Sequence, residues 1–174
     1  MKLNPTVAGV TTARIQPENQ RGGAPGARTK PARTNTEPVV SIDSIMSRRV
    51  VTVGFDDTLA TAKSIFDEAK FHHLLVVEHG ELHGVVSDRD LLRAISPFIG
   101  STVESARDVN TLNKRVHQIM SRKPITLRPE AGIADAVELL LAHKISCIPI
   151  VDEQFRPVGI LSWRDILRAL ASQN

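Results

Sequence analysis

Two short segments of the sequence carry side chains suited to holding a small polar ligand. In each, a Ser is followed three residues later by an Asp: Ser87 with Asp90, and Ser162 with Asp165. A carboxylate accepts two hydrogen bonds from the vicinal hydroxyls of a ribose, and a helix N-terminus favours a phosphate group. The same Ser-x-x-Asp pattern is also that of a capping box, which closes a helix N-terminus without any ligand. Both interpretations stay open, and they are compatible, because the Ser can cap the helix while the Asp reaches outward.

The two segments belong to an internal repeat. The stretch 84–90 (GVVSDRD) corresponds to 159–165 (GILSWRD), an offset of 75 residues. The stretch 45–53 matches 119–127 with an offset of 74, so one residue is inserted ahead of the second glycine. A repeat this long, present only twice, indicates two copies of one domain unit rather than a solenoid.

Apolar spacing and turn residues predict a β-α-β-β-α unit in each copy. In the first copy the predicted strands are 50–53, 74–77 and 82–86, with helices at 58–70 and from Ser87 onward. In the second copy they are strands 125–127, 146–151 and 157–161, with helices at 132–143 and 163–172. A unit of about 55 residues is too small to bury a large core alone, so the two units should pack around a pseudo-two-fold axis.

We therefore predict an α/β (α+β) fold of two repeats preceded by a disordered tail. The expected boundaries are 1–38 for the tail, 39–104 for the first repeat and linker, and 105–174 for the second repeat. The tail contains five Pro and four Gly and shows no apolar period. Such a segment cannot bury enough apolar surface to offset the entropy of ordering it.

The basic character of the chain lies in this tail. Residues 1–40 carry six of the 22 basic and two of the 19 acidic side chains, which leaves 16 basic and 17 acidic ones for the rest. A basic arm for an anionic partner is one interpretation, and a solvated leader is the other. The arm has no aromatic side chains for base stacking and no dense basic cluster, so we do not expect nucleic acid as a partner.

Composition also limits location and chemistry. No apolar run approaches the roughly 18 to 20 residues of a membrane span, and the N-terminus does not resemble a secretory signal. Cys147 is the single cysteine, which excludes an intramolecular disulfide. These features favour a cytoplasmic protein without a membrane segment, in which Cys147 is an inert buried thiol.

No arrangement of side chains in the sequence suggests an enzyme or a metal site. The histidine pairs are badly placed for a metal: His79 and His83 flank a turn, and His72 and His73 point to opposite sides of a strand. Neither a Gly-rich phosphate loop nor a Cys-x-x-Cys motif is present. We expect no catalytic residues, no metal ligands and no required cofactor.

The repeat resembles the CBS domain, the unit named after cystathionine β-synthase. The matching features are the Met-Ser-x-x-Val/Pro-x-Thr motif, the Ile-Pro-Ile-Val strand at 148–151 and the Gly-Φ-Φ-Ser-x-x-Asp signature, where Φ is a branched or aliphatic residue. The resemblance covers about 41–174, and the order of motifs is similar to that of stand-alone two-CBS proteins, including the acetoin-utilisation type. It implies clefts between the repeats that bind adenosine-containing ligands such as AMP, ADP, ATP or S-adenosylmethionine.

By this resemblance, Asp90 and Asp165 would hold ribose hydroxyls, and Ser87 and Ser162 would lie near ribose or phosphate. Four further residues are weaker candidates. Arg89 and Arg164 precede each Asp and are expected either to meet phosphate or to be solvated. Thr52 and Thr126 end the first strand of each copy, where they either touch ligand or serve only as β-branched strand residues.

The two copies differ, so two equivalent sites are not expected. Leu75 of the first copy stands opposite Pro149 of the second, and Asp88 stands opposite Trp163. Trp163 is expected either to stack on a base or to pack at an interface. Three consecutive leucines at 139–141 cannot share one face of a helix, which suggests a homodimer contact through that helix.

The leading hypothesis is a non-enzymatic regulatory module that binds an adenosine-containing nucleotide between its repeats. It would transmit energy or ligand status to a downstream protein of unknown identity. The alternative is a ligand-free scaffold or interaction subunit in which the signatures only cap helices.

Overall fold

The computed structural model describes residues 41–68 and 71–172. The predicted tail 1–38 lies outside the described residues, as do the last two residues of the helix predicted at 58–70. The elements of the first half are η1 (Ile42–Ser44), β1 (Thr52–Val53), α1 (Leu59–Glu68), β2 (His73–Glu78), β3 (Glu81–Ser87) and α2 (Asp88–Ala94). Those of the second half are α3 (Ala106–Asn110), η2 (Thr111–Asn113), η3 (Val116–Gln118), β4 (Ser121–Arg122), α4 (Ile133–His143), β5 (Cys147–Val151), β6 (Pro157–Ser162) and α5 (Trp163–Ala171).

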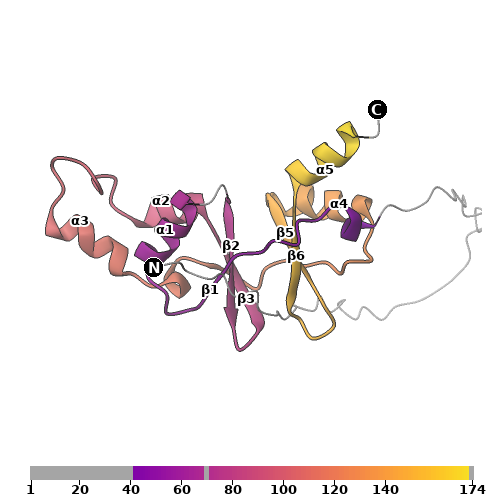
Figure 1. Cartoon of the computed structure of the whole chain (residues 1–174), viewed down its shortest axis with the longest axis horizontal. Helices are drawn as coiled ribbons and strands as arrows, with labels where there is room; N and C mark the ends of the chain where they lie inside the picture. Colours follow the sequence, from indigo (N-terminus) through magenta and orange to yellow (C-terminus); the bar gives the residue numbers. More distant parts are fainter. Residues whose placement is uncertain (1–40, 69–70, 173–174) are drawn as a thin grey trace, which may run out of the picture.

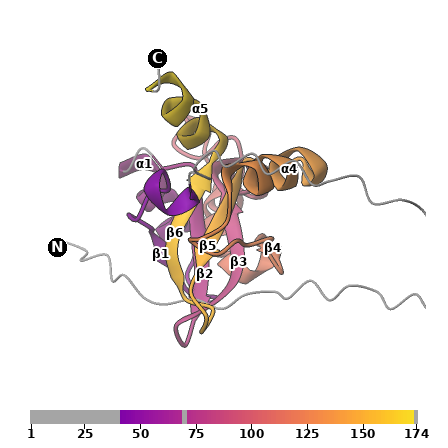
Figure 2. The ribbon, with the colours of Figure 1, turned by 90° about the vertical axis from the view of Figure 1, so that its right-hand side faces the viewer.

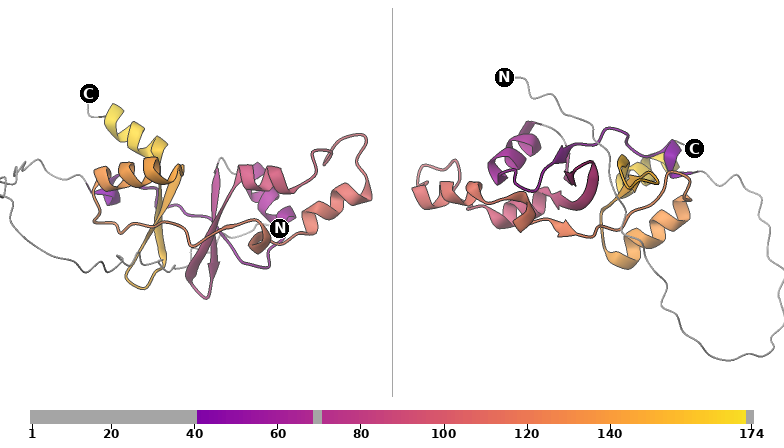
Figure 3. Two further views of the ribbon diagram at one scale, coloured as in Figure 1. Left: turned by 180° about the vertical axis from the view of Figure 1, so that it is seen from behind. Right: turned by 90° about the horizontal axis from the view of Figure 1, so that it is seen from below.

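Two antiparallel hairpins, β2–β3 and β5–β6, form the centre of the molecule, and the helices lie outside them (Figure 1). Their turns project to the same side, away from α2 and α5, as the views in Figures 2 and 3 also show. The turn after β2 contains His79 and Gly80, both at positive φ, as a two-residue hairpin turn requires. The mixed α and β class and the repeated unit are confirmed.

The two sheets are built alike, but the first has four strands and the second has two. The first runs β1-β2-β3-β4, with β1 parallel to β2 and the other pairs antiparallel. In the second, Leu127 forms one parallel bridge to Ile150 beside the β5–β6 hairpin. The strand predicted at 125–127 is thus wrong except at this bridge, because the prolines at 124 and 129 interrupt regular pairing on either side.

The segments that precede each repeat are exchanged between the repeats. We call 41–53 the first leading segment and 114–127 the second. Ser47 pairs with Ile160 of β6 through two backbone hydrogen bonds of 2.9 Å, and β4 pairs with β3. In Figure 1 the first leading segment starts beside the second repeat and crosses the molecule to β1.

This exchange completes both hydrophobic cores. Ile42 and Met46 of the first leading segment are buried among α4, β5, β6 and α5. Val116 and Met120 of the second are buried among α1, β2, β3 and α2. A third cluster joins the two repeats at the centre; its buried members are Val50, Leu75, Leu82 and Val151. As expected, neither unit closes its core alone. Each core is completed by the leading segment of the other repeat, in addition to packing between the repeats.

The glycine of each signature allows this exchange. A Cβ at Gly84 would lie 2.8 Å from Met120 Sδ and 2.9 Å from the carbonyl oxygen of Ser121. A Cβ at Gly159 would lie 2.6 Å from Met46 Sδ and 3.1 Å from the carbonyl oxygen of Ser47. The methionine can shift, but the paired backbone cannot, so only glycine admits the leading segment.

None of the helices within 41–68 and 71–172 combines the length and apolar character needed to cross a bilayer.

Replacing Gly84 by Ala should lower the free energy of unfolding by about 1–3 kcal/mol, because the new methyl group overpacks the contact with the second leading segment. Gly159→Ala should do the same. Denaturant unfolding of both variants measures the effect, with Ser101→Ala on an exposed loop as the control. Unchanged stability in both glycine variants would contradict the proposed role of these contacts.

Candidate functional site

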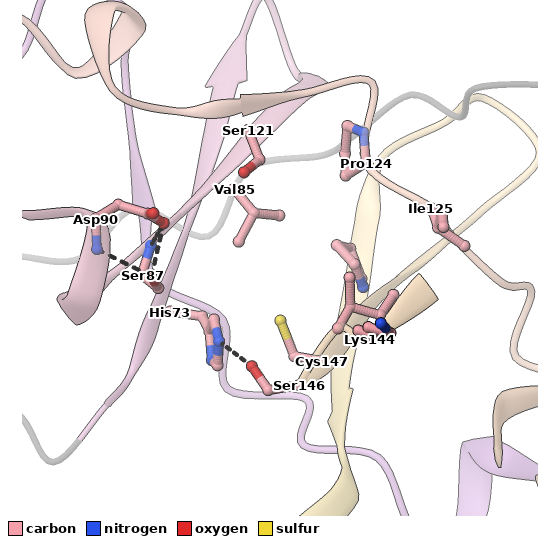
Figure 4. Close-up of a pocket in the computed structure, with 12 residues that line it drawn as sticks. His73, Val85, Ser87, Asp90, Ser121, Pro124, Ile125, Lys144, Ser146 and Cys147 are labelled. Atoms are coloured by element: carbon pink, nitrogen blue, oxygen red, sulfur yellow. Dashed lines mark hydrogen bonds between the residues drawn. The ribbon is translucent and has the colours of Figure 1, made fainter. Parts of the chain in front are cut away.

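The first cavity, about 260 Å³ in volume, lies where the signature of the first repeat meets the second leading segment and β5 (Figure 4). We call it the Asp90 cavity. Its polar and charged lining residues are His73, Ser87, Asp90, Ser121, Lys144 and Ser146. Apolar walls come from Val85, Pro124, Ile125, Ile145, Cys147 and Pro149.

The second cavity, about 270 Å³ in volume, lies where the signature of the second repeat meets the first leading segment and the start of β2. We call it the Asp165 cavity. Besides Asp165 it is lined by Ser162, Trp163, Ser47, Phe71, His72 and Ile160. Four arginines also line it, namely Arg49, Arg89, Arg164 and Arg168.

His73 and Ser146 line both cavities and separate them. His73 Nε2 lies 2.9 Å from Ser146 Oγ, and this hydrogen bond joins the two repeats (Figure 4). Burial lowers the pKa of His73, against the opposing negative charge of Asp88. At neutral pH the imidazole is therefore uncharged, and the wall between the cavities carries no net charge.

The Ser87–Asp90 pair forms a capping box at α2. Oδ2 of Asp90 accepts from the backbone N–H of Ser87 at 3.0 Å and from Ser87 Oγ at 2.6 Å, and Ser87 Oγ accepts from the Asp90 N–H at 3.2 Å. Among the described residues, nothing donates a hydrogen bond to Oδ1 of Asp90. The capping interpretation is thus confirmed here, and one carboxylate oxygen remains for another donor.

At α5 the Asp carboxylate contacts the Ser in the same way and has one added partner, but Ser162 Oγ does not accept a side-chain cap bond as Ser87 Oγ does. Oδ2 of Asp165 accepts from the Ser162 N–H at 2.9 Å and from Ser162 Oγ at 2.6 Å. Its Oδ1 accepts from Arg168 Nη1 at 3.0 Å. In this cavity, both carboxylate oxygens are engaged within the chain.

A third Ser-x-x-Asp pair shows that capping alone does not mark a site. Ser105 and Asp108 form the same capping box at α3, with distances of 2.9 Å and 2.5 Å from the Ser105 N–H and Oγ to Asp108 Oδ2. Neither residue lines the Asp90 or the Asp165 cavity. What distinguishes the two signatures is the cavity beside them.

The backbone N–H groups at the starts of α2 and α5 differ in whether they have hydrogen-bond partners. At α2, the Asp88 N–H donates to the carbonyl of His72 and the Arg89 N–H donates to the carboxylate of Asp88 at 2.8 Å. At α5, Trp163 replaces the Asp and cannot accept this bond. The N–H of Arg164 therefore has no hydrogen-bond partner among the described residues.

The other predicted residues are distributed unevenly. Arg89 and Arg164 both line the Asp165 cavity, although Arg89 belongs to the signature of the first repeat. Thr52 and Thr126 line neither cavity. Thr126 Oγ1 is buried and makes no hydrogen bond within the described part of the chain.

Sequence reasoning missed several lining residues. Ser47 and Ser121 belong to the repeated Met-Ser motif, and that repetition was an available signal. No sequence signal marked Lys144 or Arg168. Lys144 is an exposed charge at the C-terminus of α4, and Arg168 is an exposed charge on the surface of α5.

Cys147 lies in the wall of the Asp90 cavity, and burial raises the pKa of its thiol to about 12. The expected burial of this thiol is confirmed. Trp163 is 47% exposed, and the Arg164 guanidinium lies 5.4 Å from its ring centroid. Its indole is therefore placed to report on ligands in the Asp165 cavity. The described residues contain no group of three or more metal-ligating side chains.

The sequence was compared with protein families, curated proteins and solved structures. The family model of the CBS domain matches twice, at 42–97 and 116–172. A CBS domain-containing protein of Dictyostelium discoideum is 30% identical over 133 residues, which are 75% of this chain and 91% of that protein. Several other relatives are longer enzymes, of which this chain spans about a quarter.

Solved structures agree with this match. AcuB from Vibrio cholerae, named for acetoin utilization, superposes with a TM-score of 0.63 at 24% identity, covering 78% of this chain and 93% of AcuB. CBSX2, crystallised in complex with AMP, superposes with a TM-score of 0.63 at 26% identity, covering 76% of this chain and 97% of CBSX2.

Acid should destabilise the protein through His73. Because the pKa of His73 is lowered in the folded state, the unfolded state binds more protons once the pH falls below about 6.5. Stability is then lost progressively as the pH falls from this value towards the folded-state pKa. His73→Gln, which keeps a hydrogen-bonding group for Ser146, should flatten the dependence. Urea unfolding between pH 7.5 and 5 measures it, with exposed His143→Gln as control; an equal acid loss in His73→Gln and wild type would refute the assignment.

Proposed function

Because this chain belongs to the CBS-domain family and carries two repeats, we propose that it is a non-enzymatic regulatory module that binds adenosine-containing ligands between the repeats. The bound ligand would report energy or ligand status to a partner protein. AMP, ADP, ATP and S-adenosylmethionine are the candidate ligands, and a cytoplasmic location goes with this role.

The observation that carries the proposal is the composition of the two cavities. Each joins the Ser and Asp of one repeat to the leading segment and central strand of the other. In each, the helix start and its carboxylate stand at one end, and strand residues such as Val85 or Ile160 form an apolar wall. A nucleoside needs this combination: a carboxylate for the ribose hydroxyls and a flat apolar wall for the base.

The AMP complex of CBSX2, whose sequence is 26% identical, supports this ligand class. The free Oδ1 of Asp90 supports it further. Because Oδ2 caps the helix, the whole carboxylate is held in a fixed orientation. A ribose hydroxyl would therefore meet Oδ1 as a preorganised acceptor. At Asp90 the capping and ligand roles would therefore fall to different oxygens of one carboxylate.

A ligand in either cavity would touch both repeats at once. It would change their relative arrangement only to the extent that it binds one arrangement better than another. The hydrogen bond between His73 and Ser146 lies between the cavities and joins the two repeats, so such a rearrangement would alter it.

The alternative function is a scaffold whose signatures only cap helices. The confirmed capping boxes favour it, because they need no ligand. The cavities favour the sensor, since Ser105 and Asp108 form the same capping box but line neither the Asp90 nor the Asp165 cavity. Substitution of the three aspartates separates the two functions.

Asp90→Ala and Asp165→Ala should each weaken binding of an adenosine ligand by about tenfold or more at the altered cavity, because a hydrogen-bonding carboxylate is lost. Asp108→Ala should leave binding unchanged. All three should lower stability by roughly 1 kcal/mol through the lost cap. Calorimetric titration with AMP, ATP and S-adenosylmethionine, together with thermal unfolding, provides both readouts.

If the three variants lose only stability, and binding stays at the wild-type level, the aspartates are caps and their assignment to a ligand site is wrong. Absence of binding to wild type across the three ligands would favour the scaffold function.

We also propose that the module forms a homodimer through α4. Leu140 is 7% exposed and packs in the core, whereas the adjacent Leu141 is 73% exposed. Leu167 and Leu170 of α5 are also more than half exposed, at 54% and 52%. Burial against a second copy would remove this apolar surface from water.

Leu141→Glu should convert a dimer into a monomer, because a carboxylate would be buried at the contact. Sedimentation equilibrium measures the mass, and Val103→Glu on an exposed loop is the matched control. A monomeric wild type, or a Leu141→Glu variant that stays dimeric, would rule out this contact.

A further inference from the structure

The two cavities differ sharply in charge. The Asp90 cavity has one lysine and one aspartate in its lining, so its formal charge is zero with His73 neutral. The Asp165 cavity has four arginines and one aspartate, so its formal charge is +3 with its histidines neutral. Two of these arginines, Arg89 and Arg164, come from the signatures of different repeats. An anionic ligand is therefore attracted to the Asp165 cavity and not to the Asp90 cavity.

Arg168 adds a constraint that the Asp90 cavity lacks. It donates one hydrogen bond to Oδ1 of Asp165, so ribose hydroxyls must compete with the guanidinium for that oxygen. The corresponding residue of the first repeat, Arg93, makes no hydrogen bond within the described residues, and Oδ1 of Asp90 is free. A ligand without a phosphate offers Arg168 no replacement for its carboxylate partner.

A phosphate supplies that replacement. The Arg168 side chain is 74% exposed, so its ion pair with Asp165 is solvated and contributes little to stability. Guanidinium groups bind phosphate through paired, charge-assisted hydrogen bonds. Arg164, whose backbone N–H has no hydrogen-bond partner among the described residues, lines the same cavity. Binding a phosphate would thus free Asp165 for the ribose.

We propose that Arg168 is a specificity-determining residue that makes the Asp165 cavity selective for phosphorylated nucleosides. When no phosphate is bound, Arg168 competes with ribose for the Asp165 carboxylate. When a phosphate is bound, Arg168 pairs with the phosphate instead. The Asp90 cavity has no such residue and binds nucleosides with or without phosphate. This inference rests on the proposed function, because it presumes that the cavities accept adenosine compounds.

The test compares AMP with adenosine in the full chain. Trp163, the single tryptophan, lies in the Asp165 cavity and reports that site alone, while calorimetry reports both sites. In wild type, AMP should bind at the Trp163 site at least about tenfold more tightly than adenosine, as expected for a gained charge-assisted hydrogen bond. In Arg168→Gln this ratio should fall to within about threefold, through weaker AMP binding and equal or tighter adenosine binding. Arg93→Gln is the matched control and should keep the wild-type ratio.

Equal affinities of AMP and adenosine at the Trp163 site of wild type would overturn the inference and leave the proposed function standing. The same conclusion follows if Arg168→Gln lowers the affinities for AMP and adenosine by the same factor. If wild type binds neither of these compounds, and neither ATP nor S-adenosylmethionine, in both measurements, the proposed function is overturned, and this inference with it.

Discussion

The structure depends on the close approach of each leading segment to the glycine of the opposite repeat. Ser47 pairs with β6 beside Gly159, and Ser121 pairs with β3 beside Gly84. This approach buries Met46 in the core of the second repeat and Met120 in the core of the first repeat. Each core is then completed by the other half of the chain, so folding of the two repeats is coupled. It also places the serines of the two Met-Ser motifs in the cavity walls.

The cavities are a consequence of this exchange, and their differences follow from a few substitutions between the copies. Asp88 at the start of α2 pairs with His72 and accepts from the Arg89 N–H. Trp163, its counterpart at α5, leaves that part of the helix start open to the Asp165 cavity. The start of α2 is therefore closed by the side chain of Asp88, whereas the start of α5 is partly open and surrounded by arginines.

The sequence predicted the elements and the pairing of each Ser with its Asp, because periodicity and local capping patterns act over a few residues. It did not predict the exchange of leading segments. A buried pattern around Met46 or Met120 shows that a face is covered, but not which segment covers it. The strand predicted at 125–127 shrank to one bridge to β5 because the prolines at 124 and 129 interrupt its pairing. The position of Arg89 at the Asp165 cavity depends on the reach of a long side chain between repeats, which no local pattern encodes.

The most direct test of the central claim is amide hydrogen exchange of the full chain with and without AMP. If ligand binds where the leading segments meet the signatures, protection should rise together in segments of both repeats. For the Asp165 cavity these are 47–49 with 160–165, and for the Asp90 cavity they are 85–90 with 121–125. Protection confined to one repeat, or none at saturating AMP, would contradict a site built by the exchange.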